Sequence, residues 1–340
     1  MRWLTSSLQW LQSSTLKLLL VGGGVLLVWG IFAPVGTLTW WLQQSAEQLG
    51  IKESKRATLS SRSKSTNINC YIVYFPGVGD FSANQTTSGE EFFLHQLVQQ
   101  HQNCVAVSDV FPYSASNTSL GGERLFAPVW REIEQGHGWL QKADVLIKIR
   151  NLWRFAISAD DRYGQIYNQG IALAILDRMN AAHPIPNDQP IKVILVGTSG
   201  GAQVALGATP PLVDLLRQIS PNDQLNAEVI MVSLGGDFRG TEGFEAAQHV
   251  YHLQGEKDWI EDLSRWLFPS RWSITVGSPF NQARRNGRYT AQTIGPHEHD
   301  GDRGYFGLAL VGNTQTRYVE LTLQQVNQLP IWSTPQPQQS

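Results

Sequence analysis

Cysteine is scarce in this chain of 340 residues, which contains only 2 of them. Two thiols cannot build a disulfide-rich scaffold or a four-thiolate metal site, so both classes of protein are excluded. An excess of one charge is also missing, because 26 Lys and Arg are balanced by 28 Asp and Glu. This balance gives no electrostatic basis for a nucleic acid as the main partner. The 31 Gly and 16 Pro follow no period, which excludes a collagen-like chain.

Charge is absent altogether from one stretch near the N-terminus, between Leu18 and Ala46. Residues 18–38 form an apolar run of about twenty residues, long enough to cross the hydrocarbon core of a bilayer. We therefore expect an amphipathic segment and a single-pass transmembrane anchor in residues 1–42, and a membrane localisation. A cleaved signal peptide and a buried helix of a soluble core remain alternative interpretations of the run.

Residues 43–66 are polar and rich in serine, and they are expected to form a tether. More basic residues lie after the apolar run, within 52–62, than before it. The positive-inside rule then favours a cytoplasmic location for the C-terminal domain, although long domains can cross a membrane regardless of charge. The side of the membrane on which the domain lies is therefore left open.

A regular alternation of apolar runs and helical patterns begins at Ile68. Strands are expected within 68–80, 104–114, 191–201, 227–237, 249–258 and 288–296, and helices over 88–103, 167–183 and 202–208. Strands that alternate with helices predict an α/β fold with a doubly wound, mostly parallel sheet. The domain is expected to span residues 67–328, with a disordered tail over 329–340.

The sequence Gly197-Thr198-Ser199-Gly200-Gly201 matches G-x-S-x-G between a buried strand and a helix with small residues. A nucleophile at the tip of such a sharp turn occupies strained backbone space, so its neighbours must be small. The N–H groups at the start of the next helix stabilise negative charge near the serine oxygen. The alternative is a glycine turn in which Ser199 has no chemical role.

A serine nucleophile needs a general base, and the base needs an acid that orients it. Asp258 comes after the strand within 249–254, and His297 and His299 come after the last strand. The elbow, the Asp258 turn and the late histidine loop together resemble the α/β-hydrolase superfamily of serine hydrolases, over roughly residues 68–325. This resemblance implies the chain order serine, acid, histidine.

The resemblance leaves two choices within the triad. His299 is preferred as the base, because H-x-G-x-x-G-Y-F resembles the histidine loop of these hydrolases, and His297 is the alternative. Asp258 is preferred as the acid, and Asp237 occupies the other position that this fold uses. The resemblance also implies an oxyanion hole formed by the N–H of Gly200 with that of Gly77 or Val78. The family often has His-Gly where this chain has Pro76-Gly77.

Competing ligand sites lack their motifs. Neither glycine turn contains G-K-[ST], so no nucleotide is expected as a partner. His297-Glu298-His299 with Asp300 and Asp302 is rich in metal ligands, but no HExxH motif accompanies it. We therefore expect no metal and no other cofactor.

Cys70 and Cys104 each stand at the start of an expected strand. In an α/β-hydrolase these two strands would be neighbours, so the resemblance makes a Cys70–Cys104 disulfide a candidate, and two buried free thiols are the alternative. A disulfide would indicate an oxidising compartment.

The leading interpretation is a membrane-anchored serine hydrolase, similar to an esterase or lipase, that cleaves a carboxylic ester or related acyl bond. Its substrate would be a small molecule or a lipid, with the aromatic segment 115–160 as a candidate lid. A catalytically silent domain of the same fold that binds a partner or lipid at the membrane is the alternative.

Overall fold

The computed structural model describes residues 68–79, 86–114, 144–186, 189–219 and 227–332. The expected anchor and tether, and residues 115–143 of the candidate lid, lie outside these ranges. Within the described ranges, no helix has the length and apolar character needed to cross a bilayer.

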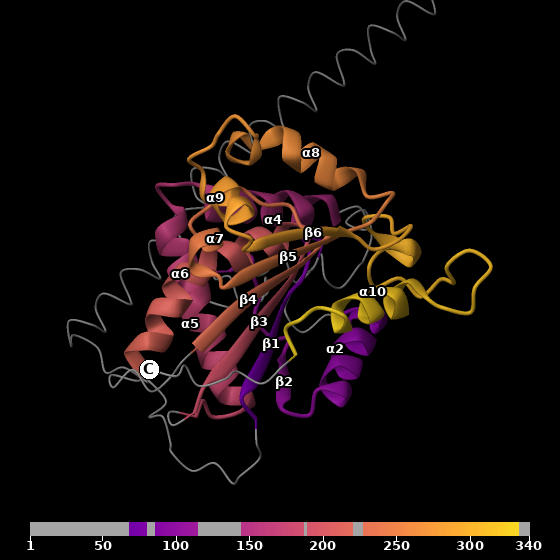
Figure 1. Ribbon diagram of the computed structural model, residues 1–340, viewed down its shortest axis with the longest axis horizontal. Coiled ribbons are helices and arrows are strands. Elements are labelled where there is room, and N and C mark those ends of the chain that lie inside the picture. Colours follow the sequence, from indigo (N-terminus) through magenta and orange to yellow (C-terminus); the bar gives the residue numbers. More distant parts are fainter. Residues whose placement is uncertain (1–67, 80–85, 115–143, 187–188, 220–226, 333–340) are drawn as a thin grey trace, which may run out of the picture. The chain divides into compact units, whose positions relative to one another are not determined.

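The described part of the chain contains one six-stranded sheet with the order β2-β1-β3-β4-β5-β6 (Figure 1). Every neighbouring pair of strands is parallel. The strands are β1 (Cys70–Phe75), β2 (Cys104–Val107), β3 (Ile191–Thr198), β4 (Ala227–Leu234), β5 (His249–Gln254) and β6 (Tyr289–Thr293).

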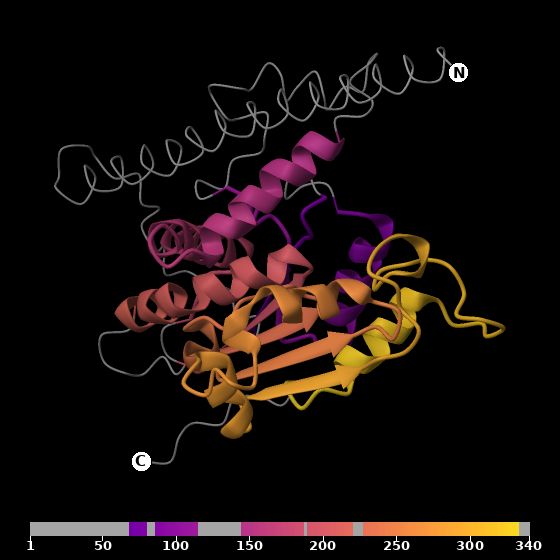
Figure 2. The same ribbon diagram turned by 90° about the horizontal axis from the view of Figure 1, so that it is seen from above.

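Helices cover both faces of this sheet. They are α2 (Ser88–Gln100), α4 (Asp144–Ala159), α5 (Gly164–Ala182), α6 (Gly200–Ile219), α7 (Gly243–Ala246), α8 (Trp259–Leu267), α9 (Pro279–Arg285) and α10 (Tyr318–Asn327), with the 3-10 turns η3 (Pro269–Arg271) and η4 (Gly301–Arg303). In Figures 1 and 2, α2 and α10 pack together on one side, whereas α5 and α6 lie on the other. The predicted α/β class is confirmed, and the sheet is entirely parallel.

Burial explains why these segments became strands. Every residue of β1 and of β3 is buried, because helices cover both faces of the central strands. The edge strand β6 is different, since its residues Thr290 to Thr293 are exposed and mainly polar. The apolar content of a strand therefore depends on its position in the sheet.

The N-terminus of α2 shows how a local signal sets an element boundary. Thr87 is the N-cap residue and accepts a hydrogen bond from the backbone N–H of Glu90, whose carboxylate accepts one from the Thr87 N–H. This capping box satisfies two N–H groups that the first helical turn would otherwise leave unpaired.

The strand order creates a switch point at β1. The chain passes from β1 to β2 on one side of it and then crosses to β3 on the other side. The loops after β1 and β3 therefore run in opposite directions from neighbouring strand ends and leave a crevice between them, where ligands bind in open parallel sheets. The turn after β3 contains Ser199.

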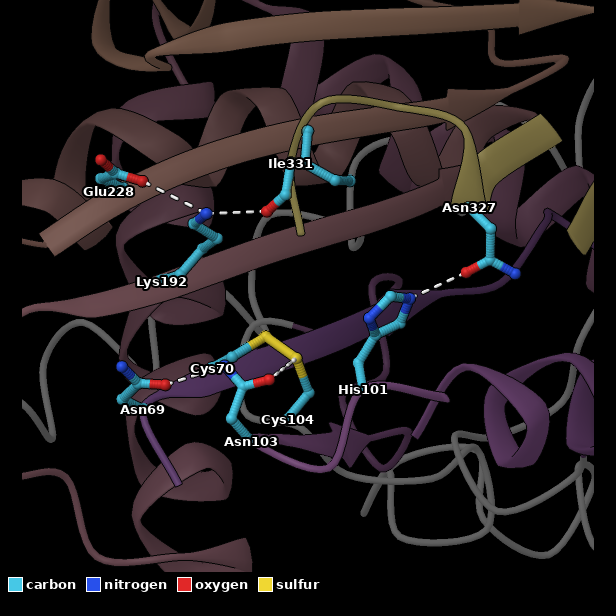
Figure 3. The surroundings of a disulfide bond; sticks show 9 residues. All are labelled: Asn69, Cys70, His101, Asn103, Cys104, Lys192, Glu228, Asn327 and Ile331. Atoms are coloured by element: carbon cyan, nitrogen blue, oxygen red, sulfur yellow. Dashed lines mark hydrogen bonds and ion pairs between the residues drawn. A yellow bond between two sulfur atoms is a disulfide. The ribbon is translucent and has the colours of Figure 1, made fainter. Parts of the chain in front are cut away.

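A disulfide joins Cys70 and Cys104 at the other edge of the sheet (Figure 3). The two residues are direct partners in the parallel register of β1 and β2, and both side chains are buried. Asn103 donates a side-chain hydrogen bond to Asn69 beside the bond. The candidate disulfide is therefore present, at the amino ends of the strands.

The expected disordered tail begins too early at residue 329. Leu329 and Ile331 are buried, and the carbonyl of Ile331 accepts a hydrogen bond from the ammonium of Lys192 at 2.7 Å (Figure 3). The indole of Trp332 stacks on the ring of His101. The apolar side chains of this segment cover the sheet, so the packed domain extends to Trp332.

Candidate active site

Ser199 lies at the turn between β3 and α6, and its backbone is strained. Among the described residues it is the one non-glycine residue with a positive φ, at 46°. The glycines around it allow close packing, since a Cβ on Gly197 would lie 2.7 Å from the Cα of Ala202. A Cβ on Gly201 would lie 2.4 Å from the carbonyl oxygen of Pro76. The first and last glycines of the G-x-S-x-G pattern are therefore required by sterics.

A continuous set of hydrogen bonds runs from this serine to a buried carboxylate. The Oγ of Ser199 lies 3.0 Å from Nε2 of His299. The Nδ1 of the same imidazole lies 2.9 Å from Oδ1 and 3.0 Å from Oδ2 of Asp258. The structure therefore brings together the serine, histidine and aspartate preferred from the sequence, with the geometry of a nucleophile, a base and an orienting acid.

Asp258 is held in place from three directions. It is the N-cap residue of α8, where its Oδ1 accepts a hydrogen bond from the N–H of Ile260 at 3.1 Å. The hydroxyl of Tyr305 donates to Oδ2 at 2.7 Å and accepts from the N–H of Gly255 at 2.8 Å. These bonds fix the carboxylate plane, which in turn fixes the ring of His299.

The charges of this pair shift both pKa values. Burial disfavours a charged imidazole, but the hydrogen bond and the negative charge of Asp258 outweigh it and raise the pKa of His299. Burial also disfavours the Asp258 carboxylate, but its hydrogen bonds to His299 and Tyr305 hold its pKa below the usual value. The pair therefore favours a proton on His299 and a charge on Asp258.

His297, the alternative base, points away from Ser199. Its ring is fully buried, and Nε2 lies 3.0 Å from the hydroxyl of Thr322 and 3.2 Å from the carbonyl oxygen of Tyr318, both on α10. Burial lowers its pKa. The histidine thus secures the loop to α10 and takes no part in the hydrogen bonds of Ser199.

Asp237, the alternative acid, lies beside the site without a hydrogen bond to His299. Its backbone N–H donates to the carbonyl of Ser199 at 3.0 Å, so it supports the elbow. Burial raises its pKa to about 6, and its Oδ1 is buried without a hydrogen-bond partner. His299 therefore interacts with this carboxylate only through space.

The loop after β1 lies against the nucleophile. A Cβ on Gly77 would lie 3.6 Å from that of Ser199, and one on Gly200 would meet the side chain of Val78 at 2.7 Å. The carbonyl of Val78 accepts a hydrogen bond from the side chain of Asn151 at 2.8 Å. The N–H groups of Gly77, Val78 and Gly200 therefore belong to peptides that converge at Ser199.

Three side chains of this site were not expected from the sequence. Tyr305 supports Asp258, Asn151 holds Val78, and the hydroxyl of Tyr113 donates to the carbonyl of Pro76 at 3.0 Å. Tyr305 stands within the histidine loop that carries the resemblance, which was its only signal. Asn151 and Tyr113 are far from their partners in sequence and have none.

A separate hollow of about 560 Å³ lies among α5, α6 and the loop after β4. Its lining includes Asp160, Asp161 and Arg239, and the guanidinium of Arg239 is already paired with Asp161 at 2.8 Å. None of the three triad residues lines it. The chemistry of the site therefore lies at Ser199 and not in this hollow.

The described residues contain no group of three or more His, Cys, Asp and Glu side chains placed to hold a metal ion. His297 and His299, which flank Glu298 in the sequence, instead bind to different elements. Comparison with known proteins adds nothing to this site: no protein-family model matches the chain, and no curated protein matches it.

Proposed function

We propose that this protein is a serine hydrolase of the α/β-hydrolase superfamily that cleaves a carboxylic ester or related acyl bond. The observation that carries the proposal is the continuous hydrogen bonding from Ser199 through His299 to Asp258. The positive φ of Ser199 and the all-parallel sheet beneath it support the proposal further.

In the first half of the reaction, the Oγ of Ser199 attacks the acyl carbonyl carbon. His299 Nε2 accepts the serine proton as the new C–O bond forms, and Asp258 stabilises the resulting imidazolium. The N–H of Gly200, together with that of Gly77 or Val78, donates to the oxyanion. The imidazolium then returns the proton to the leaving alkoxide, and the acyl group stays on Ser199.

In the second half, water replaces the alcohol. His299 takes a proton from the water as its oxygen attacks the acyl-enzyme, and the same proton returns to Ser199 as the ester bond breaks. The products are the free carboxylic acid and the unmodified enzyme. No cofactor enters either half of this proposed cycle.

The test is covalent labelling of the full chain in detergent with a fluorophosphonate, which reacts with activated serines. We expect an adduct on Ser199, located by peptide mass, that disappears in His299→Ala. The matched control is His297→Ala, which should retain the adduct because His297 does not contact Ser199. Ester turnover should fall by roughly 10⁴–10⁶-fold in Ser199→Ala. A folded chain without any adduct would favour the catalytically silent, partner-binding domain.

The location of the domain is part of the same proposal. The apolar run of residues 18–38 would anchor the chain in a membrane through a single span. The Cys70–Cys104 disulfide favours the oxidising side of that membrane, in opposition to the basic residues within 52–62.

A further inference from the structure

Helix α8 has its apolar and polar faces reversed with respect to the domain. Trp259, Leu263 and Trp266 are 65 %, 41 % and 72 % exposed, whereas Glu261 and Ser264 are buried. Positions three and four apart lie on one side of a helix, so the first three form one outward face. A surface helix ordinarily turns its apolar face to the core. In α8 that face lies in water.

The polar face of α8 is fixed by a buried ion pair. Arg271 donates to Oε1 of Glu261 at 2.6 Å and to the hydroxyl of Ser264 at 3.0 Å. Its guanidinium also lies 4.4 Å from the ring centre of Phe238. Rotation of α8 to cover its tryptophans would leave Glu261 and Arg271 buried without a partner. The outward position of the tryptophans is therefore built into the fold.

Further exposed apolar side chains continue this face. Trp272 is tied to α8 by a hydrogen bond from its indole N–H to the carbonyl of Arg265, and Ile274 beyond it is 81 % exposed. Figures 1 and 2 show α8 as an outer helix of the domain. Together these side chains form the α8 surface, which comprises Trp259, Leu263, Trp266, Leu267, Trp272, Ile274 and Val276. Soluble proteins rarely expose contiguous apolar patches without a binding role.

The α8 surface leads to the nucleophile. Asp258 is the N-cap of α8, so Trp259 is the next residue after a member of the triad. At the other end of α8, the ring of Phe268 lies 6.1 Å from that of Phe155 on α4. Phe155 in turn approaches Gly200, where a Cβ would lie 3.2 Å from it. Partly exposed aromatic rings thus connect the outer face with Ser199.

We propose that the α8 surface docks on a lipid bilayer and admits the acyl chain of a lipid-borne ester to Ser199. The substrate half of this inference rests on the proposed serine hydrolase. Tryptophan prefers the interface between headgroups and hydrocarbon, where its ring is apolar and its N–H is hydrated.

Charge around the α8 surface fits the same occupant. The exposed charged side chains of residues 256–286 are mostly basic and comprise Lys257, Arg265, Arg284, Arg285, Glu256 and Asp262. Basic side chains beside an apolar face are attracted by anionic lipids. The guanidinium of Arg285 donates to the carbonyl of Val276 at 2.8 Å, which places this charge at the edge of the α8 surface.

The length of chain before the domain also favours a bilayer. A flexible tether over residues 43–66 would have an end-to-end distance of roughly 25–30 Å. The proposed anchor would thus keep the domain within reach of the membrane and raise the effective concentration of lipid at the α8 surface. A weakly binding face would suffice under these conditions.

The docking test places a polarity-sensitive fluorophore on the full chain at Trp266→Cys, reconstituted in vesicles of phosphatidylcholine and phosphatidylglycerol. The control carries the label at Leu310→Cys, an exposed apolar position outside the α8 surface. Quenchers attached to lipid acyl chains should quench the label at 266 and not the one at 310. Quenching at 266 by aqueous iodide alone overturns the proposal.

Two other occupants have distinct signatures in this experiment. Protection of the label at 266 that persists in detergent, without lipid, would show that a segment of this chain covers the surface. Protection that increases with protein concentration would show a second copy. Either result without lipid quenching overturns bilayer docking.

The substrate test compares Trp259→Ser/Trp266→Ser with Leu308→Ser/Leu310→Ser as the matched control. The first variant should lower hydrolysis of a long-chain lipid ester in those vesicles by about tenfold or more, because its face no longer partitions into lipid. Hydrolysis of water-soluble p-nitrophenyl acetate should stay within about twofold of wild type in both variants, since neither change touches the triad. Equal losses on both esters overturn the lipid-substrate assignment. If wild type hydrolyses neither ester, the proposed function fails, whereas the quenching result still decides the docking surface.

Discussion

His299 experiences opposing influences from burial and from Asp258, and the carboxylate prevails. A general base must be neutral to accept the Ser199 proton, so kcat/KM should fall as pH drops through the raised pKa of His299. The acid limb should therefore have its midpoint above pH 6.5. Stability moves in the opposite direction: the contribution of the pair is complete below pH 6.5 and is lost as pH rises through the raised pKa.

Replacing Asp258 by Asn tests the origin of this shift. The loss of the charge should move the acid limb to lower pH and reduce kcat by about 10⁴-fold, because the imidazolium is no longer stabilised. A pH profile of ester hydrolysis measures both effects. Asp300→Asn is the control, since this exposed carboxylate raises the pKa of His299 less than Asp258 does. An unchanged midpoint in Asp258→Asn would contradict the assignment.

Asp237 gives a prediction of the opposite kind. Its pKa rises from 3.8 to about 6 on folding, so the native state binds more protons between these values and loses stability as pH rises through that range. Asp237→Asn should therefore raise the free energy of unfolding at pH 8 by about 1–3 kcal/mol and leave it little changed at pH 3. Urea melts at the two pH values measure this.

Turnover separates Asp237 from Asp258. Because Asp237 makes no hydrogen bond to His299, Asp237→Asn should keep most of the ester turnover that Asp258→Asn loses. A collapse of activity in Asp237→Asn, with the fold intact, would transfer the role of the acid to Asp237.

At the scale of elements, the elbow depends on the contact between the start of α6 and the loop after β1. Gly201→Ala would place a methyl group 2.4 Å from the carbonyl oxygen of Pro76 and 2.5 Å from that of Phe75. Both are backbone atoms, so the loop that carries Gly77 and Val78 must move. We expect a loss of about 1–3 kcal/mol in stability together with a loss of kcat.

The matched control is Gly277→Ala, where a new Cβ would meet nothing within 4 Å. Stability and turnover of this variant should be close to wild type, and a thermal melt with an ester assay reads both. Equal effects of the two substitutions would mean that helix propensity, and not the elbow contact, decides the result.

At the scale of the whole molecule, the disulfide and the triad lie at opposite ends of the strands. Cys70 and Cys104 begin β1 and β2 and are separated by 34 residues in sequence. Their bond restricts the unfolded chain, so Cys70→Ser/Cys104→Ser should cost about 3–4 kcal/mol of stability. Turnover below the new melting temperature should not change, because about 20 Å of strand separates the bond from the active end.

A reducing agent provides the control for this prediction. Reduced wild type should melt at the temperature of the double variant, and the double variant should not respond to the reductant. A melting temperature that is independent of reductant in wild type would show that the bond does not form in solution.

Adjacent residues were sufficient to predict the strands and the elbow. Period and apolar character in the segments 191–201 and 227–237 reflect burial on both faces of a parallel strand, and burial leaves its mark directly in the sequence. The close packing around Ser199 likewise demands glycines at fixed neighbouring positions. Local sterics therefore determined which serine is placed at the end of a central strand.

The tertiary structure decided which of two similar side chains faces that serine. His297 and His299 stand two positions apart, and packing of His297 against Thr322 of α10 leaves His299 to contact Ser199. The choice of Asp258 over Asp237 depends equally on Tyr305, 47 residues away. Long-range packing selects such partners because the energy of a buried hydrogen bond depends on its full set of neighbours, which no local pattern contains.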